Sequence, residues 1–447
     1  LFYFLPAVLV VYFLVPRRFK NVVLLVFSLA FYGWGEPVYV LLMVFSILMD
    51  YSLGRWMHTR LEKGNVRAAR RILVLSVVCN LALLAFFKYA DFLIGNLNGL
   101  FGLGIPKLDL PLPIGISFYT FQAMSYLIDL YRGDVPVQKS LVAFGTYVSL
   151  FPQLIAGPIV RMSTVSAELS CRRETADLFS SGIRRFVAGL GKKVLLANNI
   201  GAVWTAISQQ DVTTLPVLTA WIGLAAFTLQ IYFDFSGYSD MAIGLGRMFG
   251  FHFLENFNYP YTAVSVTDFW RRWHISMTSW FRDYIYFSLG GSRCAPWRHY
   301  LNIVIVFVCS GLWHGADWRY LAWGLLTGLL AAFGVMTARA RQRINRYNPL
   351  YRMGWFKVFW QCLFTNALFC LTLVFFASAI YNTDPFAVYG SLLQGWDGLT
   401  GSWAQVSNLI YSSGIDGRLP VVLLFGCFVV FAAEHKGRSV ARWIRQQ

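Results

Sequence analysis

The segment between residues 268 and 318 organises this chain. It opens with DFWRRWHISMTSWFRDYIYF at 268–287 and closes with SGLWHGADW at 310–318. Each part holds one histidine among aromatic residues, His274 in the first and His314 in the second. The stretches on either side are long and apolar, so we expect membrane helices that enclose the two histidines.

The composition is that of a polytopic membrane protein. Of 447 residues, 57% are apolar, 17% aromatic and only 13% charged. A soluble domain carries about twice that charged fraction, and a spanning helix needs roughly 20 apolar residues. We predict an all-α membrane protein with about ten or eleven transmembrane helices, some short or broken, together with re-entrant and interfacial helices.

The net charge of +17 is concentrated in short stretches between the apolar runs. These stretches are 17–20, 55–71, 161–193, 271–298, 339–357 and 436–445. Basic loops are expected on the cytoplasmic face, and some can also attract an anionic cytosolic partner or donor. We expect no nucleic-acid partner, because the chain has no separate basic soluble domain to hold one.

Cysteine spacing and missing motifs argue against several classes of protein. The seven cysteines are scattered, and no pair has metal-ligand spacing, so we predict neither a disulfide framework nor a metal site. The chain has no Gly-x-Ser-x-Gly, P-loop or His-Glu-x-x-His motif. Their absence argues against a hydrolase triad, an ATP-driven pump and a zinc protease.

Two polar interruptions before the central segment are candidate parts of a site. Residues 142–160 are apolar but are cut by two prolines, a glycine and Gln153. Broken backbone at membrane depth needs protein or a water-filled cavity around it. Residues 151–158 are therefore a candidate re-entrant segment lining a cavity, and a plain loop between spans is the alternative.

The second interruption begins inside the predicted span 215–235 and continues to residue 240. It contains Gln230, Asp234, Ser236, Tyr238 and Asp240. Carboxylates beside an apolar helix are costly in lipid, so these residues should face the interior or an interface and support a site. The alternative is a helix end that Asp and Ser cap.

The segment 264–288 has helical periodicity. Its large apolar residues recur at three and four positions and include Trp270, Trp273, Met277, Trp280, Tyr284 and Phe287. We predict one amphipathic helix that lies in the membrane plane or dips into it. His274 would then lie about 100° from the aromatic stripe, at the edge of the apolar face. Two spans over 300–338, hinged at 311–315, and last spans at 355–381 and 419–433 should follow.

His314 has the most unusual setting of the six histidines. It lies between apolar runs, with Gly311 and Gly315 close by and Trp313 beside it. An ionisable group at that depth is a functional hypothesis by default, and a buried histidine satisfied by a neighbouring helix is the alternative. A neutral histidine can take a proton from a hydroxyl or thiol that attacks an acyl carbon. The glycines would let a substrate approach the backbone.

Taken together, these motifs resemble those of the membrane-bound O-acyltransferases. The nearest branch is that of the bacterial alginate O-acetyltransferases and D-alanyl-transfer proteins. The matching stretches are FYGWGEP at 31–37, FPQLIAGP at 151–158, DFSGYSD at 234–240, RRWHIS at 271–276, WFRDYIY at 280–286 and GLWHG at 311–315. Each stretch alone is a weak match, and together they are specific.

The resemblance implies a ring of helices around a central tunnel, in a single membrane-embedded domain over 1–447 with its core at 30–338 and closing helices at 355–435. His314 would be the catalytic histidine, and His274 the second family histidine on the cytoplasmic side. Arg271 and Arg272 would either meet the phosphates of the donor or only mark topology. The residues expected along the tunnel are Trp313, Trp273, Gln153, Gln230, Asp234, Ser236, Tyr238 and Asp240.

The resemblance also implies a reaction. An acyl thioester donor, most simply acetyl-CoA, would arrive from the cytosol as a substrate, and no cofactor would stay bound. The acyl group would cross the bacterial cytoplasmic (inner) membrane toward an envelope polysaccharide, often through an extracytoplasmic partner of the SGNH esterase type. The alternatives are a transporter or flippase of an envelope precursor, and a scaffold whose histidines are replaceable. The lack of inverted-repeat symmetry and of paired intramembrane charges argues against the transporter.

Overall fold

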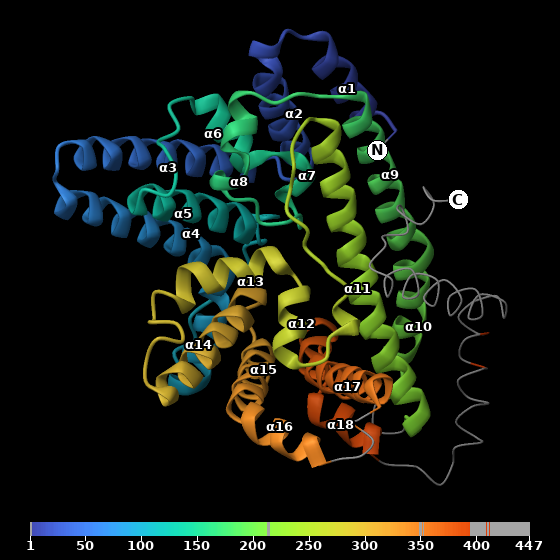
Figure 1. The fold of residues 1–447 in the computed structure, drawn as a ribbon. Coiled ribbons are helices and arrows are strands. Elements are labelled where there is room, and N and C mark those ends of the chain that lie inside the picture. The colour runs from blue at the N-terminus through green and yellow to red at the C-terminus, as the bar shows by residue number, and fades with distance from the viewer. Residues whose placement is uncertain are drawn as a thin grey trace. The chain divides into compact units, whose positions relative to one another are not determined.

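The computed structural model describes residues 2–211, 215–347, 351, 353–393, 408 and 411. Within these residues every regular element is a helix, which confirms the predicted all-α fold (Figure 1). The chain packs as two compact units. The first unit comprises residues 1–183 and 242–254, and the second comprises 184–241 and 255–447.

Five helices among the described residues are long and apolar enough to cross a membrane. They are α3 (Tyr39–Glu62), α4 (Val66–Phe101), α11 (Val217–Met248), α15 (Trp318–Met336) and α17 (Gly354–Tyr381). They confirm a multi-pass membrane protein. The count of about ten or eleven spans, the ring, the tunnel and the single domain stay predictions. The predicted span 419–433 lies outside the described residues.

The first unit places shorter helices around the α3–α4 pair. These are α1 (Phe4–Leu14), α2 (Lys20–Gly35), α5 (Ile116–Arg132), α6 (Leu141–Ser149), α7 (Phe151–Leu154) and α8 (Met162–Ser170). The turn between α3 and α4 holds Gly64 at φ 69°, a left-handed conformation that glycine adopts without strain. Asn65 then caps α4, because its side chain accepts a hydrogen bond from the amide of Ala68.

The backbone between α6 and α8 is broken, as its prolines predict. The helix α7 has only four residues and is buried. The side-chain amide of Gln153 donates to the carbonyl of Tyr147 at 2.8 Å. A Cβ at Gly157 would lie 2.4 Å from the Cα of Gln153, so only glycine fits there. Protein atoms thus support this segment, and its place beside a cavity stays a prediction.

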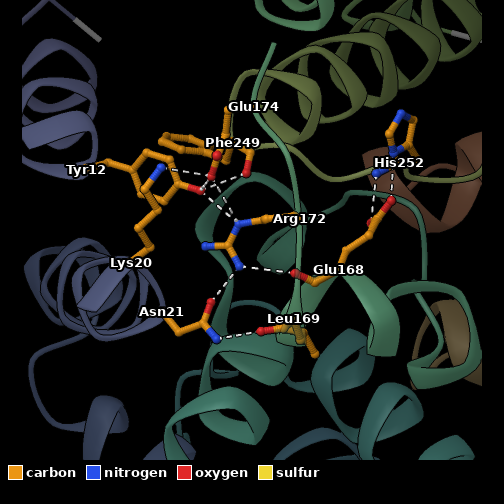
Figure 2. Close-up of polar contacts among 9 residues, drawn as sticks. All are labelled: Tyr12, Lys20, Asn21, Glu168, Leu169, Arg172, Glu174, Phe249 and His252. Carbon is orange, nitrogen blue, oxygen red and sulfur yellow. Dashed lines mark hydrogen bonds and ion pairs between the residues drawn. The ribbon is translucent and has the colours of Figure 1, made fainter. Parts of the chain in front are cut away.

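A buried charged cluster ties α1 and α2 to the segment after α8 (Figure 2). The guanidinium of Arg172 donates from Nε to Tyr12 Oη at 2.8 Å and from Nη1 to Asn21 Oδ1 at 2.6 Å. Glu174 accepts a hydrogen bond from the Tyr12 hydroxyl at 2.5 Å and pairs with Lys20 at 3.0 Å. We call these five residues the Arg172 cluster.

The second unit contains α10 (Asn198–Ser208), α12 (Val266–Arg272), α13 (Ile275–Phe281), α14 (Pro296–His314), α16 (Ala338–Tyr347) and α18 (Pro385–Leu393). The helices α9 (Ala176–Gly191) and α11 contribute residues to both units. The predicted hinge between two helices is confirmed, since α14 ends at His314 and α15 begins at Trp318. These two helices approach closely: a Cβ at Gly324 would lie 2.5 Å from the carbonyl oxygen of Phe307.

The predicted single helix over 264–288 is wrong. The helix α12 ends at Arg272, α13 starts at Ile275, and His274 between them has φ 44° and ψ 53°. A left-handed conformation at a non-glycine residue is uncommon and ends the helical register. His274 is therefore not at the edge of a helix face but in a buried junction, with 1% of its surface exposed. The aromatic stripe is otherwise buried as predicted, except Phe287, which is 57% exposed.

Candidate active site

His314 ends α14, and aromatic side chains from two further helices enclose its ring. The ring centroid of Trp323 lies at 5.2 Å and that of Tyr320 at 6.4 Å, both from α15. Phe376 of α17 lies edge-on at 5.0 Å. Three packed helices therefore fix the position of this imidazole.

The two glycines near His314 serve helix packing. A Cβ at Gly311 would lie 2.3 Å from the carbonyl oxygen of Tyr320, and one at Gly315 would lie 2.2 Å from the Tyr320 ring. Tyr320 already fills the space that the sequence analysis reserved for a substrate. That interpretation of the glycines is wrong, because the α14–α15 contact requires them.

Trp313 joins His274 to the same site. Its ring centroid lies 6.1 Å from that of His274 and 5.0 Å from that of His314. On its other side, the His274 ring meets Phe235 of α11 edge-on at 4.6 Å. Two histidines from separate segments thus share one aromatic environment, which the spacing of their motifs alone does not reveal.

The environment of His274 favours its neutral form. Burial lowers the pKa of His274 well below its usual range, and the nearby His314 ring lowers it further whenever that ring is protonated. The Nε2 atom of His274 is buried and has no hydrogen-bond partner among the described residues. Buried polar atoms are usually paired, so this unpaired ring nitrogen makes His274 a candidate for a role in chemistry.

The other residues expected along a tunnel divide into several groups. Trp273 packs in an aromatic core against Phe257 at 5.1 Å and Phe369 at 5.3 Å. Gln230 and Ser236 on α11 have buried side-chain oxygens without hydrogen-bond partners within the part of the chain that the structure describes. Gln153 belongs to the first unit.

The two carboxylates of α11 bind basic side chains. Asp240 pairs with Arg185 at 2.6 Å and Lys192 at 3.0 Å, and Asp234 pairs with Lys193. Because α11 continues to Met248, the interpretation of these acids as helix-end caps is wrong. They neutralise Arg185 of α9 and the two lysines of the π-helical segment that follows it, Lys192–Ala197. Tyr238 lies half-buried on the same helix, and a role of these residues toward a substrate stays a prediction.

Arg271 and Arg272 differ in their surroundings. Arg272 forms an ion pair with Asp268 one turn earlier at 2.9 Å and also reaches the carbonyl of Asn258. Arg271 is exposed, so it is the residue of the two that a phosphate can reach from solvent. Among the described residues, no group of three or more His, Cys, Asp or Glu side chains could hold a metal ion.

The chain is similar to several known proteins. The family described as MBOAT, membrane-bound O-acyltransferase, matches residues 134–375, which include both histidines. The probable alginate O-acetylase AlgI of Pseudomonas aeruginosa is 44% identical over 358 residues, covering 78% of this chain and 67% of that protein. The peptidoglycan O-acetyltransferase of Helicobacter pylori is 35% identical over 362 residues, covering 74% and 68%.

A more distant relative modifies a different polymer. The teichoic acid D-alanyltransferase of Bacillus subtilis is 28% identical over 227 residues, covering 48% of this chain and 57% of that protein. The chain spans about two thirds of the length of its alginate O-acetylase relatives.

Proposed function

The chain belongs to the membrane-bound O-acyltransferase family, and we propose that it moves an acetyl group from a cytosolic thioester, most simply acetyl-CoA, to a polysaccharide of the cell envelope. Family membership confirms the resemblance carried by the two histidine motifs and identifies an O-acyltransferase. The named polymers of the relatives are alginate, peptidoglycan and teichoic acid. A polymer of that class is the acceptor we assign to this chain.

In the proposed reaction His314 is the general base. Its neutral imidazole takes the proton of an acceptor hydroxyl while the hydroxyl oxygen attacks the thioester carbonyl carbon. The carbon–sulfur bond then breaks, the acetyl group remains on the acceptor oxygen as an ester, and the thiolate takes up one proton to leave as a thiol. One hydroxyl and one thioester thus give one ester and one thiol.

The observation that carries this proposal is the contact of Trp313 with both imidazole rings. It supports a single site in which His274, neutral through burial, assists from the donor side. Aromatic walls exclude water, which would otherwise hydrolyse the thioester.

The route of the acetyl group is part of the same proposal. The donor enters from the cytosol, and the acetyl group passes through a tunnel to the outer face of the cytoplasmic membrane. The acceptor hydroxyl in this step is that of an extracytoplasmic partner of the SGNH type. A second ester exchange then moves the acetyl group from the partner to a polymer hydroxyl and restores the partner's hydroxyl. The basic stretches between spans support a cytosolic face that attracts an anionic donor such as acetyl-CoA.

Inverted membrane vesicles test the proposal, because their cytosolic face is outermost. Vesicles carrying the chain and its extracytoplasmic partner would be loaded with alginate and given radiolabelled acetyl-CoA. We expect His314→Ala to reduce label in the polymer by about 10²–10⁴-fold, the usual contribution of a general base, at normal folded yield.

The matched control is His58→Ala. His58 lies in α3, is partly exposed and pairs with Glu62, so its loss should leave transfer unchanged. Transfer at the wild-type rate by folded His314→Ala protein would refute the role given to His314. It would favour the transporter or scaffold interpretation instead.

A further inference from the structure

Asn256 holds the junction that contains His274. Its backbone oxygen accepts from the amide of Ile275 at 2.8 Å. Its side-chain Oδ1 lies 3.1 Å from His274 Nδ1 and accepts from the amide and hydroxyl of Ser276 at 3.2 and 2.9 Å. Its Nδ2 donates to the hydroxyl of Ser239 at 3.0 Å. Asn256 is 1% exposed, so all five contacts form away from water.

These contacts determine which way the Asn256 amide points. The backbone N–H of Ser276 can only donate, so the atom that faces it must be the amide oxygen. A flipped amide would place two N–H donors against each other at Ser276, whereas the Ser239 hydroxyl can pair with either end of the amide. The oxygen therefore also faces His274, and Nδ1 of that ring must carry the hydrogen.

The consequence for His274 lies at its other nitrogen. A neutral imidazole carries one hydrogen, so a ring protonated at Nδ1 has a bare lone pair at Nε2. This Nε2 is the buried atom without a hydrogen-bond partner among the described residues. The left-handed backbone of His274 is an uncommon conformation that persists only where surrounding contacts enforce it. Asn256 supplies such contacts to His274 and to the two residues that follow it.

We propose that Asn256 is a positioning residue of the transfer reaction. It fixes His274 as the Nδ1–H tautomer and keeps Nε2 as an unprotonated acceptor toward the reacting groups. This inference rests on the proposed function, because it assigns His274 to the reaction. A purely structural Asn256 would hold the α12–α13 junction without any effect on the ring hydrogen.

Nitrogen NMR tests the tautomer without any assay of activity. The purified protein would be labelled with ¹⁵N in its six histidines, and the His274 signals identified by their loss in His274→Gln. We expect a neutral ring with hydrogen on Nδ1. A hydrogen on Nε2 in the wild-type protein would overturn the proposal, even if transfer by His314 were established.

The substitution Asn256→Asp distinguishes an effect of Asn256 on the His274 ring from an effect on folding. Aspartate keeps the acceptor oxygen, so the folded yield should stay near that of the wild type. Its negative charge favours protonated His274, and the titratable group already acting on that ring is His314. We therefore expect the acid limb of the kcat/KM profile to move to higher pH. If folded Asn256→Asp protein kept the acid limb of its kcat/KM profile at the wild-type pH, the result would contradict a positioning role.

Asn256→Ala removes the acceptor altogether. We expect kcat to fall by about 10- to 100-fold, the range for losing a group that orients a histidine, with little change in KM for acetyl-CoA. Asn256→Asp should restore much of this loss near the upper end of the pH range. Equal kcat values for the wild type and a folded Asn256→Ala protein would overturn the proposal.

Discussion

The Arg172 cluster and the pair of histidines are both buried and polar, and among the described residues each has a buried nitrogen without a hydrogen-bond partner, Nη2 of Arg172 and Nε2 of His274. They differ in how charge is compensated. In the cluster, two basic side chains face Glu174, and the Arg172 guanidinium also lies 4.6 Å over the ring of Phe251. At the other region, His274 is kept neutral by burial, has an unpaired Nε2 and lies in left-handed backbone. Compensated charge indicates a structural contact, whereas a neutral imidazole held in an unfavourable backbone conformation is a candidate for chemistry.

The largest expected effect in stability comes from the Arg172 cluster. Arg172→Met keeps the aliphatic stem but leaves Tyr12 and Asn21 without their donor. We expect the free energy of unfolding to fall by about 3–5 kcal/mol, the usual cost of deleting one member of a buried ion pair. Turnover per folded molecule should not change. Denaturation in detergent, with transfer normalised to folded protein, measures both.

The neighbouring Arg173 is exposed and provides the matched control. Arg173→Met should alter stability by no more than about 0.5 kcal/mol. If Arg172→Met instead lowered turnover while stability stayed intact, the cluster would belong to the reaction and the contrast between the two regions would fail.

A smaller effect should follow from separating α14 and α15. Gly311→Ala would place a Cβ 2.3 Å from the backbone oxygen of Tyr320, which forces the helices apart and displaces His314. We expect a loss of about 1–3 kcal/mol together with reduced turnover. Gly334→Ala, on α15, is the control, because the nearest atom to a Cβ there lies at 4.0 Å. Comparable losses in both variants would show that the close approach does not matter.

The smallest expected effects are on the pH dependence of stability. The Arg172 cluster and the pair of histidines should lose stability over different pH ranges. Burial alone would raise the pKa of Glu174, but hydrogen bonds from Tyr12 and Lys20 bring it below its ordinary range. The stability that Glu174 provides, about 1–3 kcal/mol for hydrogen bonds to a charged group, is present above the unfolded-state pKa of about 4.3 and is lost as pH falls below it.

His274 has a lowered pKa for the opposite reason, since it is buried neutral. The stability that neutral His274 provides should start to be lost below the unfolded-state pKa of about 6.5, because the unfolded chain takes up the proton first. Melting temperatures would be measured between pH 8 and about 3.5. Glu174→Gln should remove the fall in melting temperature that the wild type shows near pH 4, and His274→Gln should remove the fall that starts below about pH 6.5. A single shared window would contradict the assignment of opposite charge states.

Some of this arrangement could be predicted from the sequence. Apolar runs with few charges predict membrane helices, and the prolines at 152 and 158 predict the broken segment around α7. The three- and four-residue spacing predicts that Trp270 and Trp273 are buried on one side. Family motifs also predict His274 and His314 as site residues, and this role stays a prediction.

The remainder depends on contacts that no local pattern contains. The break at His274 is held by Asn256, which lies before α12 in a segment with no motif of its own. The helix α11 continues past Asp234 and Asp240 because basic residues of α9 and the π-helical segment after it neutralise both acids. Likewise, Gly311 and Gly315 accommodate Tyr320, a contact that forms only when α14 and α15 pack together.

The central claim is that His274 and His314 act in one site, and a double-mutant cycle tests it most directly. Transfer rates would be measured for the wild type, His274→Gln, His314→Gln and the double variant in the same vesicles, at equal folded yield. We predict strong non-additivity, with the double variant little slower than the slower single variant, because residues that act as a unit lose their effect together. A double variant slowed by the product of the two single effects would contradict a shared site.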